Sequence, residues 1–170
     1  MIMPMAYPAY IGLGANLGQP VEQLRWAVAQ LQQLAHSKLA GVSQLYGSKP
    51  VGPANQPDYV NAVALLHTSL TPHQLLQHLQ AIENEAGRVR LERWGARVLD
   101  LDILLYADDQ IRTADLTIPH VELCNRAFVV IPLLDISPAL TLPNGVKLAS
   151  LASATLSDDI HRIADNRWWL

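Results

Sequence analysis

Residues 99–106 read LDLDILLY, and this stretch restricts the fold more than any other part of the chain. Successive side chains of a strand point to opposite faces, so Asp100 and Asp102 share one face, about 6.5 to 7 Å apart along the strand. The other face is expected to be an unbroken apolar row of Leu99, Leu101, Ile103 and Leu105. One face of this strand therefore lies on a core, and a one-residue slip of register would bury both acids.

Two ionised carboxylates at neighbouring positions repel each other, and partial burial strengthens the repulsion because the local dielectric constant falls. A positive partner is therefore expected beside Asp100 and Asp102. Paired oxygen ligands suit Mg²⁺, which keeps most of its waters and takes one or two carboxylates together with substrate phosphates. The alternative is an edge strand with a hydrated outer face, or a pair that nearby arginines neutralise.

Four arginines precede the acid pair in a segment without apolar periodicity, namely Arg88, Arg90, Arg93 and Arg97. Guanidinium groups match phosphate oxygens in bidentate geometry, while a metal held by carboxylates neutralises the same phosphates from another side. With Gly95, this composition indicates a loop able to close over a nucleotide, and a solvated charged loop is the alternative. The chain has no G-x-x-x-x-G-K-[ST] segment, so a Walker A loop is not expected to hold the phosphates.

Length and composition predict one globular domain over residues 1–170, with residues 1–6 as a flexible N-terminal extension. The N-terminal stretch is apolar but broken by prolines and without a basic region, so neither a signal peptide nor a membrane span is expected. A net charge of −3 argues against nucleic-acid binding. The single cysteine, Cys124, agrees with a reducing compartment, and we expect a cytoplasmic protein.

The apolar patterns predict six main elements in the order strand, helix, strand, strand, helix, strand, at residues 9–14, 20–35, 39–46, 59–68, 72–86 and 97–106. Thr71, Pro72 and Gln74 form a capping box at the start of the second helix, and Gly87 ends it. This order is that of the α+β, ferredoxin-like βαββαβ unit, a mostly antiparallel sheet flanked by helices in α/β/α layers.

The C-terminal third has a weaker pattern, with a short strand near Ile111, a turn at residues 142–147 and a short helix at 148–154. In the strand at residues 59–68, Tyr59 and Asn61 point to the same face. The glycine-rich segment GLGANLG does not match a dinucleotide-binding loop. We interpret it as a tight strand-to-helix connection with Asn16 available for a ligand.

Four segments together resemble the 6-hydroxymethyl-7,8-dihydropterin pyrophosphokinase family, from about Tyr10 to Pro138. They are GLGANLG, GPANQPDYVNAV, IENEAGRVRLERWGARVLDLDILLY and IPHVELCNRAFVVIPLLDISP. The resemblance implies an enzyme of folate biosynthesis on a ferredoxin-like scaffold. Such an enzyme transfers diphosphate from ATP to the hydroxymethyl group of the pterin and releases AMP, with two Mg²⁺ ions.

The same resemblance implies a role for each matching position. Asp100 and Asp102 would bind both metal ions and, with Arg88 and Arg97, form the catalytic set. The residues implied for ATP are Leu76, Gln80, Glu83, Arg88, Arg90, Arg93, Trp94, Arg97, Ile103, Thr117, His120 and Arg126. Those implied for the pterin, which would lie between the rings of Tyr59 and Phe128, are Asn16, Ser48, Lys49, Val51, Tyr59, Asn61, Trp94, Asp100 and Phe128.

Without the resemblance, Tyr59 and Phe128 would be read as core residues and His120 as a hydrogen-bonded structural histidine. The chain also departs from the family pattern. Ser48 and Lys49 stand where the family commonly has threonine and proline, the arginine loop is one residue shorter, and Asp115 stands where some members carry an ATP-binding arginine.

Two other classes of function remain open from the residues alone. A γ-kinase or metal-dependent phosphohydrolase would release ADP or phosphate in place of AMP. A non-catalytic binding module would take up nucleotide without dependence on magnesium and would show no turnover. No general base is evident, and a monomer is the expected oligomeric state, although the sequence does not fix it.

Overall fold

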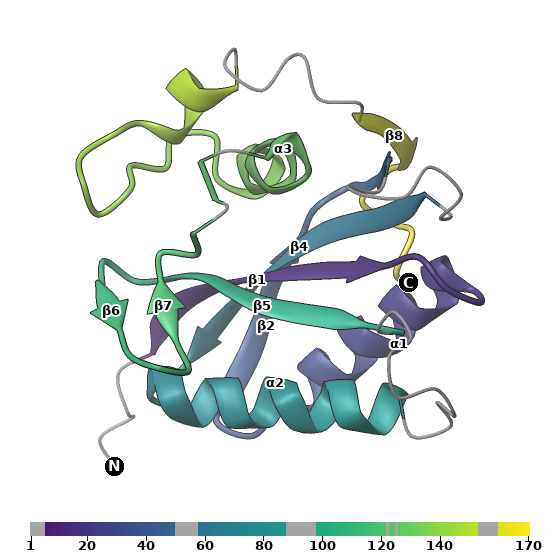
Figure 1. The fold of residues 1–170 in the computed structure, drawn as a ribbon, viewed down its shortest axis with the longest axis horizontal. Coiled ribbons are helices and arrows are strands. Elements are labelled where there is room, and N and C mark those ends of the chain that lie inside the picture. Colours follow the sequence, from purple (N-terminus) through teal and green to yellow (C-terminus); the bar gives the residue numbers. More distant parts are fainter. Residues whose placement is uncertain (1–5, 50–57, 88–97, 122, 125, 153–159) are drawn as a thin grey trace.

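A computed structural model describes residues 6–49, 58–87, 98–121, 123–124, 126–152 and 160–170 (Figure 1). Its elements are β1 (Tyr7–Ala15), α1 (Pro20–Gln32), β2 (Ser37–Val42), β3 (Leu45–Ser48), β4 (Tyr59–Thr68), α2 (Pro72–Ala86), β5 (Asp100–Tyr106), β6 (Ile111–Arg112), β7 (Thr117–Ile118), α3 (Ala127–Ile136), a 3-10 helix (Leu148–Leu151) and β8 (Ile160–Ala164).

The main sheet has the strand order β5-β1-β4-β3-β8, and β2 pairs with β4 beside β3. All of its pairings are antiparallel. Strands β1 and β2, joined through α1, lie on either side of β4, while β4 and β5, joined through α2, lie on either side of β1. This interleaving is the split βαβ arrangement, and it confirms the expected ferredoxin-like α+β class.

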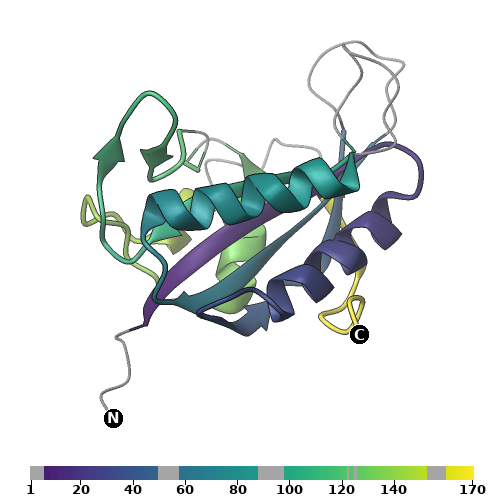
Figure 2. The same cartoon turned by 90° about the horizontal axis from the view of Figure 1, so that it is seen from below.

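Helices cover both faces of the sheet, as expected for α/β/α layers. Helices α1 and α2 lie side by side on one face, whereas α3 lies on the other (Figures 1 and 2). One apolar cluster joins the sheet to α1 and α2, and a second joins it to α3. Among the described residues, no helix is both long and apolar enough to cross a membrane.

The strand expected at residues 39–46 is in fact two strands, β2 and β3, separated at Ser43. The Ser43 backbone N–H donates to the Val63 carbonyl at 2.8 Å, and the Ser43 hydroxyl oxygen accepts from the Val63 N–H at 2.9 Å. A side chain thus replaces one backbone group in the ladder. The apolar pattern of the sequence does not reveal this break, because replacing a backbone group by the Ser43 hydroxyl does not change which flanking residues are buried.

The apolar row expected along β5 is wrong at Leu105. The pairing runs Tyr10 to Leu105 and then Ile11 to Ile103, so Leu104 is an extra residue in a β-bulge. Leu104 and Leu105 both join the cluster under α3, and Tyr106 returns to the cluster under α1 and α2. The bulge therefore exchanges the two faces from Leu105 onward, while Asp100, Asp102 and Leu104 keep the expected alternation.

Other differences concern element ends and the C-terminal third. Helix α1 ends at Gln32 and not at residue 35, because His36 adopts a positive φ of 56° and the chain turns into β2. The expected short helix is a 3-10 helix, of which residues 148–151 are described. Helix α3 and strand β8 were not predicted. The sequence of α3, AFVVIPLLDI, is apolar on nearly all sides and therefore has no helical period to detect.

The capping box at the start of α2 is confirmed. The Gln74 N–H donates to the Thr71 hydroxyl at 3.2 Å, and the Thr71 N–H donates to the Gln74 side-chain oxygen at 2.9 Å. Thr71→Ala should therefore lower the free energy of unfolding by about 1 kcal/mol, measured by urea denaturation. Thr71→Ser keeps the hydroxyl and should lose little. An equal loss in both variants would contradict a capping role.

Candidate active site

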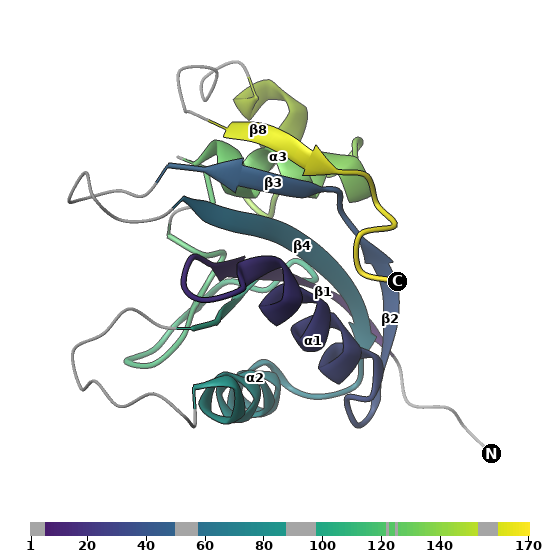
Figure 3. The ribbon, with the colours of Figure 1, turned by 90° about the vertical axis from the view of Figure 1, so that its right-hand side faces the viewer.

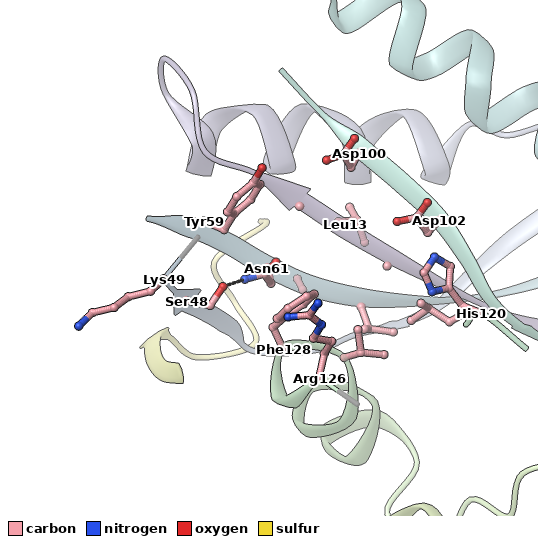
Figure 4. Close-up of a pocket in the computed structure, with 16 residues that line it drawn as sticks. Leu13, Ser48, Lys49, Tyr59, Asn61, Asp100, Asp102, His120, Arg126 and Phe128 are labelled. Atoms are coloured by element: carbon pink, nitrogen blue, oxygen red, sulfur yellow. Dashed lines mark hydrogen bonds between the residues drawn. The ribbon is translucent and has the colours of Figure 1, made fainter. Parts of the chain in front are cut away.

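A cavity of about 320 Å³ opens on the α3 face of the sheet (Figure 4). Its walls come from the ends of β3 and β4, from β5, and from the segment that leads into α3. Nine residues expected in the site line it, namely Ser48, Lys49, Tyr59, Asn61, Asp100, Asp102, His120, Arg126 and Phe128. Segments far apart in the sequence thus meet at one cavity.

The floor of this cavity is the part of β1 that carries no side chains. Gly14 pairs with Asn61 on β4 and with Asp100 on β5, and Gly12 pairs in the same way with Val63 and Asp102. A side-chain atom on Gly14 would stand 3.4 Å from the Asn61 side-chain oxygen. The Leu104 side chain lies over Gly12, so the bare strip leaves room for a flat molecule over Gly14, between the amide of β4 and the acids of β5.

Asp100 and Asp102 share one face of β5, as the alternation predicts, and β5 is an outer strand of the sheet, as the alternative interpretation expects. Asp100 is half-buried and Asp102 is exposed, and both side chains point into the cavity (Figure 4). Two carboxylates are a suitable donor set for Mg²⁺, which takes few protein ligands and completes its shell with water and phosphate oxygens. Within the described part of the chain no third carboxylate, histidine or cysteine joins them. The residues present therefore fit a phosphate-bridged metal rather than a protein cage.

Asn61 and Ser48 form a buried polar pair at the other side of the floor. The Asn61 side-chain amide donates to the Ser48 hydroxyl at 2.7 Å (Figure 4), and each residue is 6% exposed. The Tyr59 ring lies beside them at the start of β4. Burial, together with the charge of Asp100, raises the pKa of Tyr59, so its phenol stays protonated as a neutral wall of the cavity.

Phe128 and Arg126 reach the cavity from the start of α3. The guanidinium carbon of Arg126 lies 6.0 Å from the centre of the Phe128 ring, which places a cation beside the aromatic wall. His120 stands near Asp102 (Figure 4), and its backbone N–H donates to the Leu104 carbonyl at 3.0 Å. A backbone bond thus fixes His120 against the bulge in β5.

Tyrosine hydroxyls of the sheet hydrogen-bond to the last turn of α3 and to the residue that follows it. The Tyr46 hydroxyl donates to the Asp135 carboxylate at 2.6 Å, and the Tyr10 and Ser137 hydroxyls lie 2.5 Å apart. Burial, and then the bond to Asp135, raises the pKa of Tyr46, so its phenol remains the donor. Phe128 and Arg126 are therefore carried by a firmly attached helix.

Four of the residues that the resemblance implies for ATP lie apart from the cavity floor, beside the outer edge of β5. Gln80 is exposed on α2, Leu76 packs on the core, and Glu83 accepts the Leu101 N–H at 2.9 Å. The Ile103 side chain is buried between the sheet and α2. Alternation along β5 turns its backbone groups to the same open edge as those of Leu101, so it would meet a ligand through its backbone.

Two expected site residues, Asn16 and Thr117, and Asp115, which departs from the family pattern, are not among the residues that line the cavity. Asn16 is buried directly after β1. Thr117 is half-buried in β7. Asp115 accepts from the Thr113 hydroxyl at 2.8 Å, which lowers its pKa, and lies 3.4 Å from the His73 ring. This carboxylate is thus tied to its own hairpin and to α2.

Six expected residues lie outside the part of the chain that the structure describes, namely Val51, Arg88, Arg90, Arg93, Trp94 and Arg97. Conversely, the cavity includes residues that sequence reasoning missed: Gly12, Gly14, Val63, Leu104 and Val129. The two glycines had a signal, because they alternate within the predicted strand. Leu104 had the same signal, since alternation from Asp100 and Asp102 places it on their face.

The fold and the cavity define a ferredoxin-like α+β protein with a pair of metal-suited carboxylates beside a glycine-floored cavity. Comparison with known families agrees with this class: residues 10–138 match the sequence model of 7,8-dihydro-6-hydroxymethylpterin-pyrophosphokinase (HPPK). The chain belongs to this family.

Two relatives share the name 2-amino-4-hydroxy-6-hydroxymethyldihydropteridine pyrophosphokinase. The protein of Haemophilus influenzae is 54% identical over 143 residues, which cover 84% of this chain and 89% of the relative. That of Pseudomonas aeruginosa is 46% identical over 159 residues, which cover 94% and 98%.

A solved structure of Plasmodium falciparum HPPK-DHPS with pterin and p-hydroxybenzoate superposes with a TM-score of 0.74 at 15% identity. The match covers 94% of this chain and 47% of the Plasmodium chain, so this chain spans about half of that protein. At this identity the likeness concerns the fold alone.

The proximity of Asp100 to Tyr59 generates a prediction that can be checked without a ligand. Asp100→Asn should lower the pKa of Tyr59 toward 10.0, because a nearby negative charge no longer opposes the phenolate, but burial should keep it above that value. An NMR titration of ¹³C-labelled tyrosine measures this shift. Asp109→Asn is the control, since Asp109 acts on Tyr106. An unchanged Tyr59 titration in Asp100→Asn would contradict the geometry.

Proposed function

We propose that this chain transfers the diphosphate of ATP to the hydroxymethyl group of 6-hydroxymethyl-7,8-dihydropterin, giving the pterin diphosphate and AMP, in folate biosynthesis. The observation that carries this proposal is the bare strip of β1. It places the amide of Asn61 and the acids of β5 on opposite sides of a floor that fits a flat ring.

The pterin is assigned to the side of the cavity formed by Tyr59, Asn61 and Phe128. A heterocycle with amide-like edges needs aromatic walls and a few aimed donors and acceptors, and Asn61 supplies both kinds of group at the floor. Its hydroxymethyl group would then point along the strip toward Asp100 and Asp102. Ser48, Lys49 and Val51 are assigned to the same side, and Asn16 and Trp94 remain predicted there.

In the proposed reaction the hydroxymethyl oxygen attacks the β-phosphorus of ATP in line, the bond from that phosphorus to the α,β-bridging oxygen breaks, and AMP leaves as the hydroxyl proton is lost. Asp100 and Asp102 would hold two Mg²⁺ ions, which when bound neutralise and orient the phosphate oxygens. Arg126 and His120 line the same cavity, where Arg126 would add positive charge and His120 a hydrogen-bonding ring.

The remaining nucleotide contacts stay predictions from the family resemblance. Arg88 and Arg97 are expected to stabilise the charge of the transition state, with Arg90 and Arg93 on the phosphates. The outer edge of β5 and α2 would receive the nucleoside. We further assign the protein to the cytoplasm as a monomer acting on two small molecules, with no nucleic-acid or membrane partner.

The decisive experiment is to incubate the protein with ATP, Mg²⁺ and the hydroxymethyl dihydropterin and to separate the nucleotide products by chromatography. AMP formed in equal amount with a diphosphorylated pterin is the expected result. ADP or free phosphate would indicate a γ-kinase or phosphohydrolase. Uptake of nucleotide without turnover, and without dependence on Mg²⁺, would indicate a binding module.

Asp102→Ala should lower kcat by at least about a hundredfold, the effect typical of losing a group that stabilises transition-state charge. It should leave the folded structure intact, because Asp102 is exposed. Asp108→Ala is the matched control, since Asp108 is an equally exposed carboxylate in the turn after β5. A normal kcat in Asp102→Ala would contradict the proposal that this residue binds the metal ions.

Gly14→Ala should raise the KM for the pterin by about tenfold, because a methyl group on the floor occupies the space of the ring. Gly41→Ala serves as the control: it also adds a methyl group within a strand, and its nearest neighbour there would be the Ile136 side chain at 3.6 Å, outside the cavity. Steady-state kinetics with each substrate measures the effect. Equal KM values in both variants would show that the strip is not the ring site.

A further inference from the structure

Residues 160–170 lie beyond the segment that matches the family, yet they support the side of the cavity assigned to the pterin. Strand β8 forms the outer edge of the sheet and pairs with every residue of β3 (Figure 3). On its other side β3 pairs with the start of β4, where Ser48 lies opposite Tyr59 and Tyr46 opposite Asn61. Strand β3 thus stands between β8 and the cavity.

Strand β3 has only four residues, and a third strand adds stability that a two-stranded pairing alone does not have. Without β8 it would be an edge strand joined to β4 by three register pairs. The fit between β3 and β8 is close, because a side chain on Gly47 would stand 2.8 Å from the His161 ring. The Arg162 guanidinium also donates to the Gln44 side chain at 2.9 Å.

The turn after β8 adds a second connection to the same region. Trp168 is buried, and its indole N–H donates to the Ser43 carbonyl at 2.9 Å. Ser43 is the residue that separates β2 from β3, and it exchanges two hydrogen bonds with Val63 in the cavity wall. A continuous chain of bonds therefore runs from Trp168 through Ser43 to β4.

Arg25 of α1 fastens this turn to the helical layer. Its Nε donates to the Trp168 carbonyl at 2.7 Å, and its Nη2 donates to the Leu170 carbonyl at 3.1 Å. The Trp168 ring is held at its backbone by α1 and at its indole N–H by Ser43. It is thereby a fixed strut between α1 and the point where β3 begins.

We propose that Trp168 is a positioning residue for the pterin: through Ser43 it sets the place of β3 and so the geometry of the Ser48–Asn61 pair. The inference rests on the proposed function, in which this pair lies at the pterin side. The acids of β5 are separated from β3 by two strands. Loss of the strut should therefore weaken pterin binding and leave nucleotide binding nearly unchanged.

Trp168→Phe tests this proposal because it removes the indole N–H and keeps an aromatic ring in the core. We expect the KM for the pterin to rise about fivefold or more, the size expected when a buried carbonyl loses its donor, with the KM for ATP unchanged within about twofold. Trp169→Phe is the matched control, since Trp169 packs on the same core from the next position and should leave both constants unchanged. A lower melting temperature with an unchanged pterin KM, or equal rises in both KM values, overturns the proposal.

A reciprocal measurement separates positioning from mere stability. If the strut and the pterin are coupled, pterin binding must slow hydrogen exchange of the β8 amides in the full-length protein, and Trp168→Phe must reduce that slowing. Equal hydrogen-exchange rates of the β8 amides with and without pterin would overturn the proposal. Failure of the proposed function is distinguishable, because it appears as a wild-type protein that forms no AMP. A wild type that binds pterin without turnover still permits the test, with calorimetric Kd in place of KM.

Discussion

The site depends on the antiparallel register of β1 between β4 and β5. That register places Gly14 between Asn61 and Asp100, and Gly12 between Val63 and Asp102. Because the period of a strand is two, the same register sends Ile11 and Leu13 into the core under α1 and α2. A one-residue slip of β1 would bring these two apolar side chains into the cavity. The register of β1 therefore determines both the packing of the core and the shape of the cavity.

The acid pair can stand on this sheet because β5 is its outer strand. Asp102 is exposed to water, so its charge is not confined in a medium of low dielectric constant, and Asp100 shares the cavity with the neutral phenol of Tyr59. Farther along β5, where α3 covers the same face, Leu104 follows the acids by alternation and the bulge adds Leu105. Within one strand the face changes from a wet, charged site to a dry core.

The sequence predicts what depends on period and local chemistry. Alternation at Tyr59–Thr68 and at Asp100–Asp102 predicts both site strands, and the capping box at Thr71 predicts the start of α2. Features that need long-range information escape: the bulge at Leu104 arises from pairing with β1, and the Ser43 break arises from pairing with Val63. The family resemblance brings together residues such as Phe128 and Asn61, which no local pattern connects.

The two sides of the cavity are also the two places where the sheet would otherwise end. On one side Glu83 of α2 accepts the Leu101 N–H, so a carboxylate occupies an outward-facing donor of β5 between the two acids. On the other side β8 pairs along β3, and Trp168 secures the point where β3 begins. Exposed edges are mobile and invite pairing with other chains, whereas a site that orients two substrates needs fixed walls. The β8 side is therefore closed along all of β3, whereas on the β5 side Glu83 occupies the Leu101 donor and the edge at Ile103 stays available to a ligand.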